Sequence, residues 1–109
     1  MADIRLDLAS LLIDVECELR NLGEWSHVPP SPAALASTQP FCIDTLTFSQ
    51  WMQFVFVVRM RSLLESDTPL PRQCGIAPMA EEYFRGLGLD VAELVRLLNT
   101  IDEKLSSAS

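Results

Sequence analysis

The hydrophobic pattern of the chain is dominated by residues 48–64, where most positions are apolar. The polar exceptions in this stretch are Ser49, Gln50, Gln53, Arg59, Arg61 and Ser62. A helix that is hydrophobic almost all round has to be surrounded by the rest of its fold or by a partner. We therefore interpret this stretch as a central helix against which the other helices pack.

The first predicted helix covers about residues 3–22. Apolar residues recur there at steps of three and four, as one buried helical stripe requires: Ile4, Leu8, Leu11, Leu12, Val15, Leu19 and Leu22. Asp3 fits an N-cap, and Gly23 fits the left-handed residue that follows a helix. Asp14 and Glu18 lie one turn apart on the opposite face, which we interpret as solvated surface and not as an acid–base pair.

The second predicted helix covers about residues 47–66 and contains the apolar stretch. Thr47 and Gln50 have the spacing of a capping box, in which each side chain bonds to the other residue's backbone N–H. Asp67 and the prolines that follow it, Pro69 and Pro71, end the helix.

Two more helices are predicted in the C-terminal third, over about residues 78–87 and 90–105. Pro78 suits the first position of the shorter helix. Asp90 and Glu93 have capping-box spacing at the start of the longer one. Three long helices, one short helix and no predicted strand make an all-α bundle, which we expect to be a single domain over residues 1–109.

A long proline-rich segment, residues 24–40, connects the first two helices. Each proline fixes its own φ and disfavours helix at the preceding residue, so the segment is predicted to be extended but ordered. Trp25, Leu35 and Phe41 are expected to hold it against the bundle. His27, the single histidine, is expected to be exposed.

Charge narrows the choice of partners. The chain has 15 acidic and 8 basic residues, a net charge of −7, which opposes direct binding to nucleic acid. Residues 37–75 contain three acids and three arginines and are neutral as a group, while both flanking thirds are acidic. The middle third is therefore where a core or a protein interface is expected.

Cysteine content and the length of apolar runs indicate in which cellular compartment the protein is expected. Cys17, Cys42 and Cys74 are an odd number without CxxC spacing, so we expect buried thiols and no disulfide framework. No apolar run approaches the roughly 20 residues of a membrane span. The N-terminus lacks the pattern of a signal peptide. A cytoplasmic protein with no membrane contact is predicted.

The chemistry-bearing residues assemble no known site. One loop histidine cannot supply the Glu-x-x-His pairs of a di-iron bundle, and the cysteines lack zinc-site spacing. Neither phosphate-binding glycine loops nor a nucleophile elbow occurs. No cofactor, no metal and no catalytic residue is predicted.

One group of residues remains as a candidate contact region for a ligand or partner: Thr38, Gln39, Phe41, Asp44, Thr45 and Arg59. A guanidinium taken out of water is costly unless a carboxylate meets it, and Asp44 is the expected partner of Arg59. The structural alternative is that this ion pair anchors the loop and that Thr38 and Gln39 hydrogen-bond its backbone.

The same segments carry a family resemblance. The motif STQPF at residues 37–41, the helix containing Trp51 and the PLP motif at 69–71 resemble the YqcC-like family of small bacterial proteins. The resemblance implies a small, soluble helical bundle but implies little about activity. Family members have been labelled by association with a tRNA pseudouridine synthase, beside which they are often encoded. Pseudouridine synthases are larger α/β proteins, so the label implies no catalysis by this chain.

Three functional hypotheses follow. The first is a non-enzymatic helical module that binds a protein partner or itself. The second is an accessory factor that acts through the synthase without contacting RNA. The third is a small-molecule site near Asp44 and Arg59.

Overall fold

The computed structural model describes residues 4–66, 69–71 and 75–107. The helices are α1 (Ile4–Asn21), α2 (Pro32–Leu35), the 3-10 turn η1 (Pro40–Cys42), α3 (Phe48–Trp51), the π-helical turn η2 (Met52–Phe56), α4 (Val57–Glu65), α5 (Ile76–Phe84) and α6 (Ala92–Ser107). The described residues contain no strand, so the predicted all-α class is confirmed. Within them, no helix is long and apolar enough to cross a membrane.

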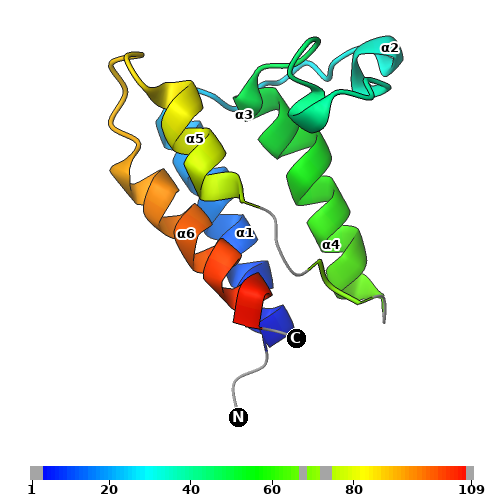
Figure 1. Ribbon diagram of the computed structural model, residues 1–109, viewed down its shortest axis with the longest axis vertical. Helices are drawn as coiled ribbons and strands as arrows, with labels where there is room; N and C mark the ends of the chain where they lie inside the picture. The colour runs from blue at the N-terminus through cyan, green and yellow to red at the C-terminus, as the bar shows by residue number, and fades with distance from the viewer. Residues whose placement is uncertain (1–3, 67–68, 72–74, 108–109) are drawn as a thin grey trace.

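The bundle has α1 in the middle. In Figure 1, α5 and α6 lie in front of α1, and the continuous helix formed by α3, η2 and α4 lies beside them. Helix α1 packs against both α6 and α4. Its buried stripe, Leu8, Leu12, Val15 and Leu19, is almost completely inaccessible to solvent.

The prediction that residues 48–64 form the central helix is wrong. One flank of this helix is open to solvent, where Val58 is 57% exposed and Arg59 is exposed. Its other apolar residues pack in two directions. Met52, Val57 and Met60 join the main core, whereas Val55 packs with Cys42 in a second, smaller core under the loop.

The π-helical turn η2 explains how one helix buries so many side chains. The Val57 N–H bonds to the Met52 carbonyl, five residues back, which widens the helix and changes its phase. Gln53 therefore points inward at 7% exposure. Its amide accepts a 2.8 Å bond from the Ser26 N–H and donates a 2.8 Å bond to the Ser26 carbonyl. This pair ties the chain after α1 to the helix.

Two predicted capping features are present. After α1, Gly23 is left-handed at φ 74°, with the Gly23 and Glu24 N–H groups bonded to the Arg20 and Leu19 carbonyls, a Schellman motif. At α3, both hydrogen bonds of the Thr47–Gln50 capping box are formed.

The capping box predicted for α6 is not formed. The Asp90 carboxylate accepts from the Ala92 N–H, and Glu93 binds Arg96 instead of reaching back. The Arg96 guanidinium lowers the pKa of the Glu93 carboxyl through this hydrogen bond. The predicted N-cap Asp3 and the thiol of Cys74 lie outside the described residues. Cys42 is buried as expected, whereas Cys17 is exposed.

Helix α5 starts at Ile76, two residues before the predicted position, because its cap comes from another helix. The Asp102 carboxylate, on α6, accepts hydrogen bonds from the Ile76 N–H at 3.2 Å and the Ala77 N–H at 2.9 Å. These are two of the N–H groups that have no partner within their own helix. A sequence reading of local spacing cannot detect a cap that lies 25 residues away.

We expect Asp102→Ala to lower the free energy of unfolding by about 1–2 kcal/mol, since it removes a charged cap from a helix N-terminus. Urea denaturation followed by circular dichroism measures the change. The matched control is Asn99→Ala, an exposed side chain one turn earlier on α6. Equal small effects of the two changes would contradict the capping role.

Candidate functional site

The candidate site is built around a tight turn at η1. Phe41 and Cys42 both have left-handed backbone conformations, at φ 58° and φ 49°. Residues other than glycine rarely adopt positive φ, and two in succession need strong local support. The support comes from the backbone, where the Cys42 carbonyl accepts bonds from the Thr45 N–H at 3.0 Å and the Leu46 N–H at 2.8 Å.

Side chains tie this turn to the loop that precedes it. Ser37 donates to the Asp44 carboxylate at 2.5 Å, and the Thr45 hydroxyl donates to the Ala34 carbonyl at 2.7 Å. Ala34 lies in α2, a short helix in the segment predicted to be extended, where Ser31 is the N-cap and Pro32 the first residue. The proline-rich connection is therefore ordered, but it is partly helical.

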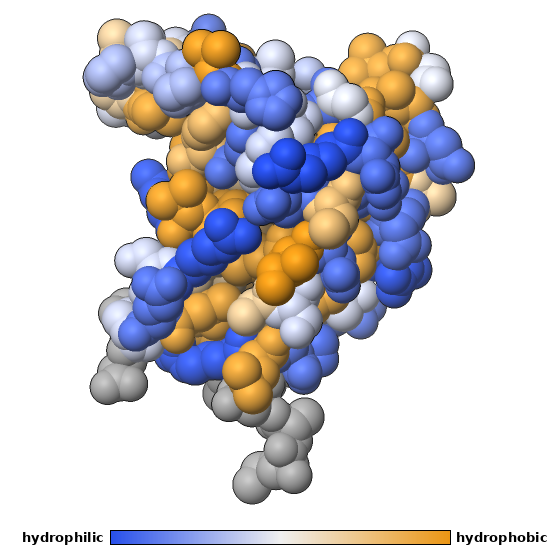
Figure 2. All heavy atoms as spheres, turned by 180° about the vertical axis from the view of Figure 1, so that it is seen from behind, coloured by the Kyte–Doolittle hydropathy of each residue, from blue (hydrophilic) through white to orange (hydrophobic). Residues whose placement is uncertain are grey.

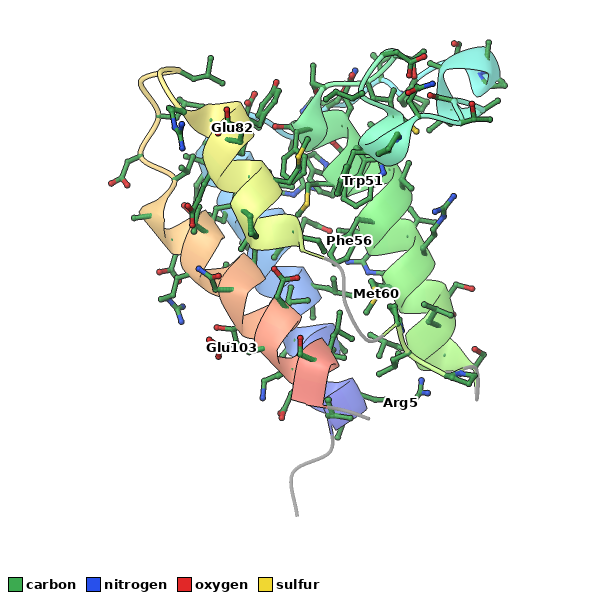
Figure 3. All side chains as sticks on the ribbon, in the orientation of Figure 1. Arg5, Trp51, Phe56, Met60, Glu82 and Glu103 are labelled. Carbon is green, nitrogen blue, oxygen red and sulfur yellow. The ribbon has the colours of Figure 1, made fainter. Side chains whose placement is uncertain are left out.

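The turn places the Phe41 ring in an aromatic cluster on α3 and η2. The Phe41 ring meets the Trp51 ring edge-on, with 4.8 Å between ring centroids, and Trp51 stacks on Phe56 at 5.7 Å. Figure 3 shows Trp51, Phe56 and Met60 following one another along the side of the long helix that faces α5 and α6. Such rings supply large contact area at low conformational cost.

Two adjoining hollows flank Phe41 and Trp51, and together we call them the aromatic groove. One, of about 340 Å³, is lined by Phe41, Trp51, Phe56, Arg59, Met60, Leu63 and Pro71. The other, of about 400 Å³, is lined by Leu35, Ser37, Thr38, Gln39, Pro40, Phe41, Cys42, Trp51, Val55 and Arg59. The first is almost purely apolar, while the second combines apolar and polar groups.

Among the described residues that line the two hollows, Arg59 is the one charged side chain. Its predicted ion pair with Asp44 is not found among the described contacts. The Asp44 carboxylate instead accepts a hydrogen bond from Ser37, one of the residues that line the second hollow. Arg59 is exposed, so its guanidinium needs no buried partner. The groove therefore combines apolar surface with one accessible positive charge.

The six candidate contact residues separate into two groups. Thr38, Gln39, Phe41 and Arg59 line the groove, whereas Asp44 and Thr45 hold the loop together from outside it. Within the loop, the described bonds between side chains and backbone involve the side chains of Ser26, Ser31, Ser37 and Thr45, and not those of the expected Thr38 and Gln39. The Ser37 hydroxyl accepts from the Gln39 N–H, and the Thr45 hydroxyl donates to the Ala34 carbonyl.

The sequence reading missed most of the apolar wall of the groove, Trp51, Phe56, Met60, Leu63 and Pro71. Trp51 was expected to be core, yet it is only half-buried. Trp51 lies two turns before Arg59 on a helix that is too apolar for a single buried face, and this combination is a signal that could have indicated an open apolar surface.

Ion pairs among the described residues lie on other faces of the molecule. They join Glu16 with Arg20 and Arg61, Asp7 with Lys104, Glu82 with Arg85, and Glu93 with Arg96. Within the same residues, no group of three potential metal ligands comes together. The described residues that line the groove are mainly apolar and aromatic, with Arg59 as their charged member.

A second apolar surface lies on the outer face of α1. Leu6 is 67% exposed and Ile13 is 58% exposed, and the exposed Cys17 follows one turn later. Figure 2 shows a hydrophobic strip down the rear face, where α1 lies, with hydrophilic side chains on both sides.

The fold defines the class of this protein: a small all-α helical bundle. Residues 7–104 match the DUF446 family, which is described as "tRNA pseudouridine synthase C". The chain belongs to this family, and the resemblance to YqcC-like proteins is confirmed.

Three related proteins show the range of the family. The solution NMR structure of YqcC from E. coli has a TM-score of 0.81 and 30% identity, covering 97% of this chain and 87% of that one. An uncharacterized Haemophilus influenzae protein is 36% identical over 90 residues, 83% of this chain and 81% of its own length.

The third relative is larger. A Pectobacterium carotovorum protein named tRNA pseudouridine synthase C is 46% identical over 75 residues, which are 69% of this chain but only 20% of that protein. This chain therefore corresponds to about a fifth of the longer polypeptide.

Proposed function

We propose that this chain is a non-catalytic, protein-binding helical module, acting as one unit over residues 1–109, and that the aromatic groove is its binding surface. The observation that carries the proposal is the combination of half-buried Phe41 and Trp51 with an accessible Arg59. Aromatic residues and arginine are enriched at the energetic centres of protein interfaces. The strained turn at Phe41 supports it further, since strain that is maintained by surrounding contacts is common at binding sites.

The partner that we favour is a tRNA pseudouridine synthase of the type named in the Pectobacterium relative. A segment similar to this chain forms part of a longer polypeptide with that name. Two modules joined in one chain meet at high effective concentration, whereas separate chains need a binding surface to remain together. An accessory role in RNA modification, in the cytoplasm, follows from this partner.

Direct binding of tRNA by this chain is not part of the proposal. The net charge of −7 opposes contact with phosphates, and the basic side chains on α1, α4 and α6 that form the described ion pairs are engaged with carboxylates. The synthase would contact the RNA, and this chain would contact the synthase.

The test is isothermal titration calorimetry of the purified chain with the tRNA pseudouridine synthase C of the same organism. The proposal expects saturable binding with a one-to-one stoichiometry. Filter binding with tRNA alone, at low salt, is the control and is expected to give none. Failure to bind the synthase would contradict the proposed partner. Tight and steeply salt-dependent binding of tRNA would contradict the statement that this chain does not contact RNA.

A further inference from the structure

We propose that the aromatic groove recognises a short peptide segment of the partner in which a carboxylate side chain lies next to apolar side chains. Arg59 is its counter-charge. This inference rests on the proposed function, since it specifies the chemistry that the partner presents to the same groove.

The charge of the groove determines the polar half of the segment. Arg59 lines both hollows, and it is the one charged side chain among the described residues that line them. A guanidinium presents a planar set of donors that matches a carboxylate, and bonds between two charged groups are the stronger class. A basic segment would bring like charges together beside apolar walls that exclude water. The complementary group is therefore an aspartate or glutamate side chain, or a chain-terminal carboxylate.

The shape of the groove determines the apolar half. The first hollow, of about 340 Å³, has aromatic and aliphatic walls and accepts apolar side chains. The second, of about 400 Å³, adds the exposed Thr38 and Gln39. Their hydroxyl and amide groups can satisfy the main chain of a bound segment, which needs partners for its own N–H and C=O groups. A peptide segment with an extended backbone and an apolar side chain next to a carboxylate would match the apolar hollow, Arg59 and the polar groups of the second hollow.

Helix α4 supplies its own control. Arg61 lies two residues from Arg59 but on the opposite side of the helix, where it pairs with Glu16 of α1 at 3.3 Å. Arg59→Gln and Arg61→Gln therefore make the same change in charge on the same helix, one in the groove and one away from it. Both arginines are exposed, so both variants are expected to fold.

The experiment selects binders from a displayed library of random peptides, using the full chain. Affinities of the selected peptides are then measured by Trp51 fluorescence in a Trp25→Phe background. We expect acidic–apolar peptides whose affinity falls about tenfold in Arg59→Gln and further in Arg59→Glu, with no change in Arg61→Gln. An amide in place of the peptide carboxylate should cause the same loss, and combining it with Arg59→Gln should add nothing, because both remove one interaction.

Several results would overturn the inference: peptides that lack a carboxylate, equal effects of the Arg59 and Arg61 changes, or no enrichment of any peptide. Binding of dodecanoate without any selected peptide would assign the groove to a small molecule. A concentration-dependent mass in light scattering that Arg59→Glu abolishes would assign it to a second copy of this chain. Both outcomes contradict the proposal.

The synthase titration separates this inference from the proposed function. If the synthase binds but Arg59→Gln leaves its affinity unchanged, the function stands and the inference is wrong. If acidic–apolar peptides bind through Arg59 but the synthase does not bind, the inference stands and the choice of partner is wrong.

Discussion

Replacing Leu12 by alanine is expected to lower the free energy of unfolding by about 2–5 kcal/mol. Leu12 is 1% exposed, on the helix that packs against both α6 and α4. Truncation leaves a cavity in the main core. The surrounding helices can close it only partly, so the lost contacts are not regained. Chemical denaturation followed by far-ultraviolet circular dichroism measures the loss.

The matched control for this prediction is Leu6→Ala. Leu6 lies on the same helix but is 67% exposed, and its truncation is expected to change stability by no more than about 0.5 kcal/mol. A similar effect of both changes would show that α1 is not the central helix.

Replacing Trp51 by alanine is expected to weaken partner binding about 30-fold or more, a loss of at least about 2 kcal/mol. Trp51 lines both hollows and contacts Phe41 and Phe56, so its removal takes away a shared wall and the closest ring neighbour of Phe41. Calorimetric titration with the synthase measures the loss, and Trp51→Phe is expected to retain most of the affinity.

Trp25→Ala is the control, because it removes the other tryptophan. Trp25 is also half-buried, but it lies at the end of α1, with the Arg20 guanidinium 4.6 Å from its ring centroid. Both changes lower stability, so each variant is first checked for native circular dichroism. If Trp25→Ala weakened binding as much as Trp51→Ala, the groove would not be the specific contact.

Local patterns predicted much of the fold. The stripe on α1, Gly23 and the Thr47–Gln50 capping box all depend on residues close in sequence, and the structure contains each of them. The features that were missed depend on distant residues. Asp102 caps a helix 25 residues earlier, and Gln53 is buried because the Ser26 backbone meets it.

The site was predicted only in part, for a related reason. Composition indicated that the middle third would contain a core or an interface, and the STQPF motif indicated Thr38, Gln39 and Phe41. Whether an apolar helix is enclosed or open depends on how many neighbours surround it, which its own sequence does not specify. The helix over residues 48–65 packs on the main core and on the small core under the loop but leaves one flank open, so Arg59 is exposed and Trp51 is only half-buried.

The most direct test of this account is hydrogen–deuterium exchange of the chain, free and bound to the synthase, read by mass spectrometry. We predict protection of the segment from Thr38 to Cys42 and of the helix around Trp51 and Arg59, with no change on the outer face of α1 around Leu6 and Ile13. Protection confined to α1, with the groove exchanging as in the free chain, would contradict the central claim that the aromatic groove binds the partner.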